Sequence, residues 1–273
     1  DKDGRKDLVL CGEMMPVKVY RNTKTGFIDQ TENYFDKPAN GMWFSINFAD
    51  VNGDGNPDLI AGNLGLNTVI RASEKEPAEL IYADFDGNGS IDPFLNFYVQ
   101  GVNYPFVSRD ELNEQIYPMR KKFNSYRAYS DVGMKDIFTE DQLQKAGKLT
   151  VNRLQTTVFL NQNGKFTPMD LPAEANFAPI TQILSKDFNH DGKTDLLLLG
   201  NHSDNRLKLG SMDANYGCFL SGNGNREFEY KNQSISGLSV TGDVKSALEI
   251  NIKNVNYLLI GISGQPLQFY KMP

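Results

Sequence analysis

Acidic residues recur in this sequence at a spacing that suits a divalent cation. Asp50–Asp58 reads D-V-N-G-D-G-N-P-D, and Asp84–Asp92 and Asp187–Asp195 repeat its pattern, D-x-[DN]-x-[DN]-G-x-x-D. Calcium takes about six to eight oxygen ligands, so a loop that binds it must turn several oxygens toward one point. Positions 1, 3, 5 and 9 offer side-chain oxygens, position 7 offers its carbonyl, and glycine at position 6 permits a positive φ. The three copies therefore predict three calcium ions.

The predicted metal ligands occupy the odd-numbered positions of each copy. They are Asp50, Asn52, Asp54, Asn56 and Asp58; Asp84, Asp86, Asn88, Ser90 and Asp92; and Asp187, Asn189, Asp191, Lys193 and Asp195. A truncated copy opens the chain, with Asp1, Asp3 and Asp7 at positions 3, 5 and 9, so a fourth ion there is left open. Asp, Asn and Gly also favour turns that bind no metal, but three matching copies favour calcium.

The residues around the loops indicate β-strands. Position 12, where an EF-hand needs a bidentate Glu, is Ala61, Leu95 or Leu198, and none of these can bind a metal. The segment F-S-I-N-F-A-D before Asp50 alternates in the manner of a half-buried strand. Short apolar runs, L-I-A-G-N and L-L-L-L-G-N, follow two of the loops. The loops are therefore expected to join strands.

These motifs resemble the FG-GAP or VCBS repeat, the blade unit of integrin-α-like β-propellers. The resemblance rests on DVNGDGNPDLIAGN, DFDGNGSIDPFL and DFNHDGKTDLLLLGN. More narrowly, FVSRDEL, DIFTEDQL, SMDANYG and LLIGISGQPLQFY are similar to the C-terminal part of Bacteroidetes VCBS-repeat surface proteins of the ASPIC/UnbV type, relatives of cartilage acidic protein. The resemblance implies calcium loops on one face of the propeller and ligand surfaces on the other.

The resemblance also implies an all-β fold with an organisation in three segments. We expect propeller blades with calcium loops at residues 1–99, a helical insertion at 100–152, and further blades at 153–273, the last of them without a calcium loop. Four or five four-stranded blades fit this length, which is fewer than a seven-bladed ring needs. Because the sequence begins inside a loop, we expect it to be a fragment of a longer propeller.

The segment 100–152 departs from strand alternation and contains helix signals. Ser108 followed by Glu111, and Thr139 followed by Gln142, predict two capping boxes. Aromatic residues such as Tyr117 and Tyr126 alternate here with Lys and Arg. They either anchor the insertion to its blade or form a surface that recognises a glycan or a protein.

Composition excludes some classes of function. The formal net charge of −6 argues against a nucleic-acid surface, and three divalent cations would balance it. The sequence contains no apolar run of the roughly 18 residues that span a membrane. Cys11 and Cys218 lie in apolar segments, which favours buried thiols, although a disulfide between them is an alternative.

The sequence favours a binding module over an enzyme. Neither of its two histidines has a recognisable catalytic partner, and most of the prominent carboxylates are assigned to calcium. We therefore expect a calcium-binding propeller module, extracytoplasmic, secreted or on the cell surface, that binds a protein or a carbohydrate and uses calcium structurally. The alternative is a polysaccharide lyase or hydrolase on the same scaffold.

Overall fold

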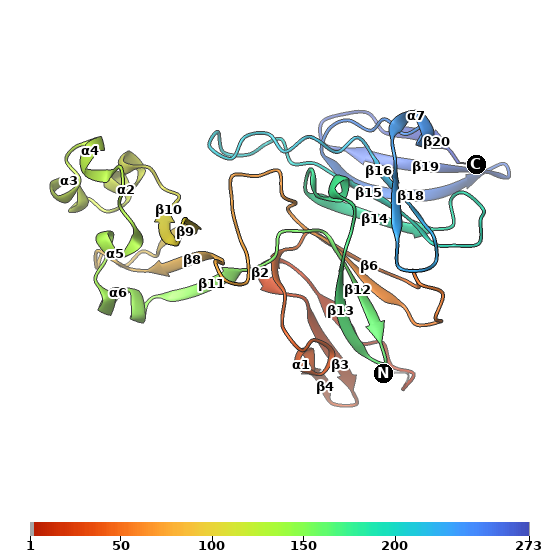
Figure 1. The fold of residues 1–273 in the computed structure, drawn as a ribbon, viewed down its shortest axis with the longest axis horizontal. Helices are drawn as coiled ribbons and strands as arrows, with labels where there is room; N and C mark the ends of the chain where they lie inside the picture. Colours follow the sequence, from red (N-terminus) through yellow and green to blue (C-terminus); the bar gives the residue numbers. More distant parts are fainter. Residues whose placement is uncertain (1–2, 273) are drawn as a thin grey trace. The chain divides into compact units, whose positions relative to one another are not determined.

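The computed structural model describes residues 3–272 and divides the chain into two compact units (Figure 1). The first comprises Asp1–Val69 and Leu154–Pro273, and the second comprises Ile70–Arg153. Strands hold 41% of the residues and helices 14%, which confirms the expected predominance of β-structure. No helix among the described residues is long and apolar enough to cross a membrane.

Two sheets of the first unit are four-stranded antiparallel meanders. One runs from β14 (Ile180–Lys186) through β15 (Asp195–Gly200) and β16 (Cys218–Gly222) to β17 (Phe228–Lys231). The other runs from β6 (Ser45–Ala49) through β7 (Asp58–Gly62) and β12 (Thr157–Gln162) to β13 (Lys165–Asp170). The second unit is inserted in this latter sheet, between β7 and β12.

The remaining sheets of the first unit have fewer strands. One contains β1 (Leu8–Leu10), β3 (Lys18–Thr23) and β4 (Gly26–Asp29), and another contains β18 (Val244–Ile252), β19 (Val255–Ile262) and β20 (Gln268–Lys271). A short ribbon pairs β2 (Glu13–Pro16) with β5 (Asn40–Met42). Short helical turns occupy connections: α1 (Thr31–Tyr34), η1 (Ala173–Asn176) and α7 (Gln233–Ser236).

Packing on both faces explains the continuous apolar run of β15. Leu196 and Leu198 join a core cluster with residues of β7 and β12, whereas Leu197 and Leu199 join a second cluster with β18 and β19. Successive side chains of a strand point to opposite faces, so a strand between two neighbouring sheets must be apolar at every position. This sheet therefore lies between two others, as a propeller blade does.

The first strands of successive sheets are also linked by hydrogen bonds. Ser45 Oγ of β6 donates to the Ile180 carbonyl of β14 at 2.8 Å, and Asn47 Nδ2 donates to the Ile183 carbonyl at 2.9 Å. Thr181 Oγ1 of β14 donates to the carbonyl of Val244 in β18 at 2.6 Å. The strands β6, β14 and β18 thus follow one another in space, an arrangement that is propeller-like.

The last sheet has a tight turn at the place where each of the three four-stranded sheets carries an acidic loop. Only Lys253 and Asn254 separate β18 from β19, and their φ angles are 49° and 64°. Two consecutive residues with positive φ are typical of a type I′ hairpin turn. This connection is too short to surround a cation.

The second unit combines a sheet with five short helices. Its strands are β8 (Ala78–Ala83), β9 (Asp92–Val99), β10 (Val102–Pro105) and β11 (Gly147–Val151); its helices are α2 (Arg109–Gln115), α3 (Met119–Lys122), α4 (Tyr126–Tyr129), α5 (Met134–Ile137) and α6 (Glu140–Lys145). Both predicted capping boxes are confirmed, at the first residues of α2 and α6. The helices share a core with the sheet that carries Asp84–Asp92, so the compact unit is wider than the expected 100–152 insertion.

The aromatic residues of this unit divide between the two expected roles. Phe123 is buried in the core, and the half-buried Tyr129 donates to the Val107 carbonyl at 2.9 Å. Tyr117 and Tyr126 are each 68% exposed, with the Arg120 guanidinium 4.8 Å from the first ring. The buried members anchor the helices, whereas these two rings face solvent.

Both cysteines are free thiols. Cys218 lies in the core beside Leu196 and Leu198, and burial raises the pKa of its thiol to about 12. Cys11 is half-buried. The structure thus favours the reading of these residues as small apolar groups and not as a disulfide.

Candidate metal centre

Three acidic loops connect the first and second strands of their sheets. Asp50–Asp58 lies between β6 and β7, and Asp187–Asp195 lies between β14 and β15. Asp84–Asp92 lies between β8 and β9, in the four-stranded sheet of the second unit. The loops therefore join strands, as the flanking residues indicate.

The side chain at position 1 is the centre of each loop. Asp50 Oδ1 accepts from the Gly53 N–H at 2.7 Å, and its Oδ2 accepts from the Gly55 N–H at 2.8 Å. The amide of Asp54 donates to Asn52 Oδ1 at 2.9 Å, and the amide of Asn56 donates to Asp54 Oδ1 at 2.8 Å. These bonds wrap the backbone around the Asp50 carboxylate and fix the side chains of positions 3 and 5 to the turn.

The same bonds recur in the other two loops. The amide at position 6 donates to position 1 at 2.8 Å from both Gly89 and Gly192. The amide at position 7 donates to position 5 at 2.7 Å from Ser90 and at 2.9 Å from Lys193. Three segments with different residues at the variable positions thus adopt one geometry.

Glycine at position 6 meets the conformational requirement of the loop. Gly55, Gly89 and Gly192 have φ angles of +83°, +89° and +83°. A side chain in this left-handed region would clash with its own backbone, at a cost of roughly 1–2 kcal/mol. The positive φ directs the amide of each glycine toward the carboxylate at position 1.

Position 9 is a buried carboxylate that ties the loop to the sheet. Asp58, Asp92 and Asp195 are 0%, 4% and 0% exposed. Asp58 Oδ2 accepts from the Val51 amide at 3.0 Å, and its Oδ1 accepts from the amide of Asn161, in the third strand of the sheet, at 2.8 Å. Asp195 accepts in the same way from the Gly222 amide at 2.9 Å.

Burial makes the ionised form of Asp58 costly. It raises the pKa of this carboxyl above its usual range, against the opposing effect of the two backbone hydrogen bonds, and the charges of Asp54 and Asp50 add to the rise. A cation beside these three carboxylates would reverse this effect, because it favours their ionised forms. The charge distribution of the loop is thus suited to a bound divalent ion.

The donor set fits calcium. Every candidate side-chain ligand at positions 1, 3, 5 and 9 offers a carboxylate or amide oxygen, which calcium prefers. Within the described residues, one group of three carboxylates brings an oxygen from each member within 4.8 Å of the others, namely Asp84, Asp86 and Asp92. At position 7, Lys193 has no side-chain oxygen, so its carbonyl would be the ligand.

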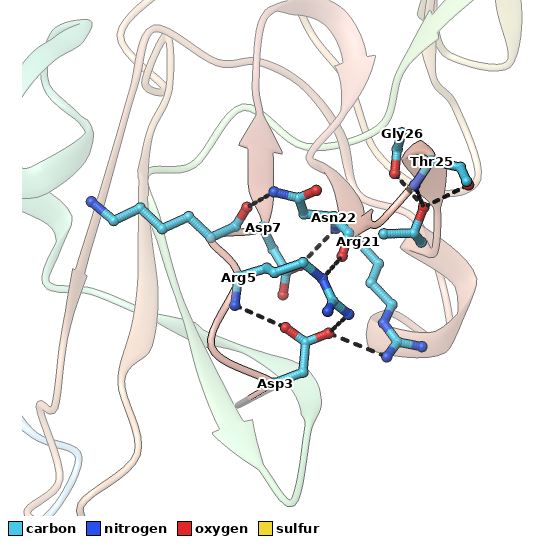
Figure 2. A network of polar contacts seen from close by, with 9 residues as sticks. Asp3, Arg5, Asp7, Arg21, Asn22, Thr25 and Gly26 are labelled. Carbon is cyan, nitrogen blue, oxygen red and sulfur yellow. Dashed lines mark hydrogen bonds and ion pairs between the residues drawn. The ribbon is translucent and has the colours of Figure 1, made fainter.

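The truncated copy differs from the complete loops in what surrounds its carboxylates. Asp1 lies outside the described residues. Asp3 repeats the position-5 contact, accepting from the Arg5 amide at 2.9 Å, and Asp7 accepts from the Asn22 amide at 2.8 Å. Figure 2 shows that the guanidinium groups of Arg5 and Arg21 both reach Asp3 Oδ2, the second of them at 3.4 Å. Two cationic side chains of the protein therefore lie against Asp3 Oδ2, a contact that has no counterpart among the bonds described for the complete loops.

Some residues that hold the loops in place could not be identified from the sequence. Thr194 Oγ1 donates to the Asp50 carbonyl at 2.8 Å and so links the two loops of the first unit. Asn161 holds the first loop twice, because its backbone amide donates to Asp58 Oδ1 and its side-chain Nδ2 donates to the Pro57 carbonyl at 3.1 Å. Gly222 acts through its backbone amide, which carries no sequence signal. The side chains of Thr194 and Asn161 could have been found only if their adjacency to the first loop had been known.

Comparison with known proteins gives a partial match. An FG-GAP-like repeat family model matches residues 1–61, a segment that contains both the truncated copy and the loop Asp50–Asp58. No curated protein matches this chain significantly. The first sheets of the chain are thus similar to FG-GAP-like repeats, in agreement with the mostly antiparallel β-structure around them.

Proposed function

We propose that this chain is a calcium-stabilised propeller module of the extracellular type that binds a protein or a glycan. The observation that carries the proposal is the recurrence of one loop geometry at three places, each with a buried aspartate at position 9. FG-GAP-like repeats are typical of extracellular domains, where calcium is plentiful. A cell-surface or secreted location follows from the same argument.

Calcium has a structural role in this proposal. In the first unit each acidic loop contacts the second and third strands of its sheet through position 9, and Thr194 links the two loops. An ion that joins positions 1, 3, 5 and 9 would close the turn between the first two strands. A ligand that binds only the folded chain stabilises it in proportion to the logarithm of its concentration.

A thermal melt with and without calcium tests the structural role. We expect the melting temperature to rise when calcium is added to chelator-treated protein, and to rise much less with magnesium, which prefers a smaller octahedral site. The double variant Asp54→Ala, Asp191→Ala should lose most of this rise, since it removes one position-5 ligand from each loop of the first unit. An unchanged melting temperature in calcium would contradict the proposal.

The narrower relationship to VCBS-repeat surface proteins of the ASPIC/UnbV type belongs to the same proposal. The resemblance is carried by residues 106–112, 136–143, 211–217 and 258–270. In this structure the first two segments contribute to helices of the second unit, the third connects β15 and β16, and the fourth spans β19 and β20. The partner of the module is then expected to contact strand connections on the side remote from the acidic loops. Binding to an array of glycans and surface proteins would test this assignment.

A further inference from the structure

The loop Asp84–Asp92 differs from the two loops of the first unit in what holds its position-9 carboxylate. In the first unit, Oδ1 of Asp58 and of Asp195 accepts from a backbone amide of the third strand of the sheet, at 2.8 and 2.9 Å. Asp92 Oδ1 accepts instead from Nε2 of Gln115, which lies 3.3 Å away in helix α2. A helix thus takes the place of a strand at this loop.

The register of the sheet in the second unit explains this exchange. Strand β10 pairs with Asn96–Val99 of β9, and the Phe106 amide extends this edge to the Leu95 carbonyl at 2.8 Å. Asp92 lies at the other end of β9. Among the described residues, its carboxylate has two donors, the Phe85 amide at 3.1 Å and the side chain of Gln115. Because Asp92 is buried, its carboxylate depends on such bonds.

Packing fixes the helix that carries Gln115. A capping box begins α2 at Ser108, and Leu112 and Ile116 are buried in a core that they share with Phe94 of β9. Helices shorter than about 12 residues are marginal in water and depend on packing, and α2 has seven residues. Gln115 therefore reaches Asp92 only while the helix is packed on the sheet.

The loop meets the helices at a second place, its position 2. The Phe85 ring stacks on Phe138, with the ring centroids 3.9 Å apart and an interplanar angle of 19°. Gln142 Nε2, from the first turn of α6, lies 3.5 Å from the Phe85 carbonyl. Position 2 of the other two loops, Val51 and Phe188, packs instead in clusters that consist mainly of strand residues. Both ends of the loop in the second unit are thus held by helices.

The carboxylates of this loop have no cationic side chain beside them. Asp84, Asp86 and Asp92 each place an oxygen within 4.8 Å of the other two, and none of them forms an ion pair with a described residue. Like charges at this separation repel each other, and a bound cation would relieve the repulsion. The residues that fit calcium here are therefore in direct contact with the helical part of the unit.

We propose that calcium at Asp84–Asp92 and the packing of helices α2–α6 on the sheet stabilise each other, with Gln115 as the residue that positions Asp92. The inference rests on the proposed function in that the loop binds calcium, and it adds a regulation that the loops of the first unit lack. A contact that orients Asp92 for the ion favours binding, and by linkage the ion favours the packed helices by the same factor. The exposed Tyr117 and Tyr126 belong to this helical part, so calcium orders the surface that carries them.

Hydrogen–deuterium exchange of the full chain over a calcium titration, read out by mass spectrometry of its peptides, tests the proposal. The amides of α2 and α6 should exchange at least about tenfold more slowly in calcium than in chelator, with the same midpoint as the loop Asp84–Asp92. Asp86→Ala should abolish this slowing. Asp54→Ala removes a ligand of a first-unit loop and should leave the slowing unchanged.

The matched pair Gln115→Met and Gln144→Met tests the positioning role. Both variants lose an amide and keep a side chain of similar length, but Gln144 donates to Glu140 at 3.4 Å on the exposed surface of α6. In Gln115→Met the calcium midpoint for α2 should rise by about tenfold to a hundredfold, the loss typical of a group that orients a metal ligand. Gln144→Met should stay within about twofold of wild type.

A further variant separates positioning from the filling of space. Gln115→Lys keeps a donor for Asp92 and adds a positive charge, so the amides of α2 should exchange slowly even in chelator and should respond less to calcium. A residue that only filled space would give the same exchange in the Met and Lys variants. Wild-type exchange of β8 and β9 at saturating calcium verifies that Gln115→Met and Gln144→Met are folded.

Two results would overturn the inference. One is exchange of α2 and α6 that does not change with calcium while peptides of the loop Asp187–Asp195 slow. The other is an equal calcium midpoint in Gln115→Met and Gln144→Met. If no acidic loop responded to calcium, in exchange or in melting temperature, the proposed function itself would fail, so the two failures are distinguishable.

Discussion

The loop Asp50–Asp58 and the N-terminal segment Asp3–Asp7 have the same backbone conformation at positions 6 and 7, but their carboxylates differ in the positive charges that lie beside them. Both have glycine at position 6 with a φ of +83°, and in both the position-7 amide donates to position 5. In the N-terminal segment, Arg5 and Arg21 neutralise Asp3. Hydrogen bonds hold the pKa of Asp54 below its usual range, first the bond from the Asn56 amide and then those of the Asn52 and Asn56 side chains, and the charge of Arg226 has a smaller effect. In the N-terminal segment two arginines of the protein supply the positive charge, whereas for Asp50–Asp58 we propose that a metal ion supplies it.

We infer from this difference that the acidic motif alone does not define a metal site. The motif sets the path of the backbone, and in our proposal the neighbouring side chains decide whether the loop binds a cation from solution. A guanidinium offers several N–H donors to one carboxylate and can replace an ion at that point. The four predictions that follow test this distinction, from the largest expected effect to the smallest.

Loss of the position-9 carboxylate should have the largest effect. In Asp58→Ala the buried amide of Val51 and the partly buried amide of Asn161 lose their common acceptor, a carboxylate with no exposed surface. Each unsatisfied buried donor costs roughly 1–3 kcal/mol, so we expect unfolding to become easier by about 2–4 kcal/mol even without calcium. Urea denaturation in chelator measures the change. The exposed Asp36→Ala, which removes one surface ion pair, is the control and should cost less than about 1 kcal/mol.

Substitution of Gly55 and of Gly4, which both occupy position 6, should distinguish the cost of backbone strain from the loss of metal binding. A Cβ at Gly55 or at Gly4 meets no atom within 4 Å, and both residues have the same φ. Gly55→Ala and Gly4→Ala should therefore each cost roughly 1–2 kcal/mol in chelator. In calcium the loss from Gly55→Ala should grow, whereas that from Gly4→Ala should not. Equal responses to calcium would show that the two loops do not differ.

Lowering the pH should destabilise the first sheet through Asp29, a carboxylate that hydrogen-bonds to Thr31 and Lys18. The hydroxyl and amide of Thr31, and then Lys18, lower the pKa of Asp29 from 3.8 to about 2. Because the folded-state pKa is depressed, this contribution to stability is present above about pH 4 and is lost as the pH falls toward 2. In Thr31→Val the pKa should move back toward 3.8, and in Thr31→Ser it should stay low. Carboxyl titration by NMR measures both variants, and identical curves would rule out the hydroxyl as the main cause.

The smallest effect is expected from Arg21→Ala. The Arg21 side chain is 46% exposed, and its contact with Asp3 is accessible to solvent. Ion pairs between exposed side chains contribute little and are screened by salt. The melting temperature should fall slightly at low ionic strength and should match wild type in high salt. A calcium-dependent rise in Arg21→Ala that exceeds the rise of the wild-type chain would show that the guanidinium blocks a metal site.

The sequence predicted the local features of this molecule better than its division into units. The loops, the apolar strand after Asp195 and the capping boxes follow from residue type and spacing, so they could be read directly. The placement of Asp84–Asp92 in the inserted unit could not, because that loop has the same local pattern as the others. The contacts of Arg21 with Asp3, and of Thr194 with Asp50, join residues far apart in the chain and became visible only in the fold.

The most direct test of the account is a count of bound calcium ions per chain by equilibrium dialysis. The three complete loops predict three ions in the wild-type chain, two in Asp54→Ala, and three in Asp3→Ala. Two results would contradict the account. One is fewer bound ions in Asp3→Ala than in the wild-type chain, and the other is the absence of saturable calcium binding in the wild-type chain. The account predicts that the three complete loops bind calcium and that the N-terminal segment, where arginines contact Asp3, does not.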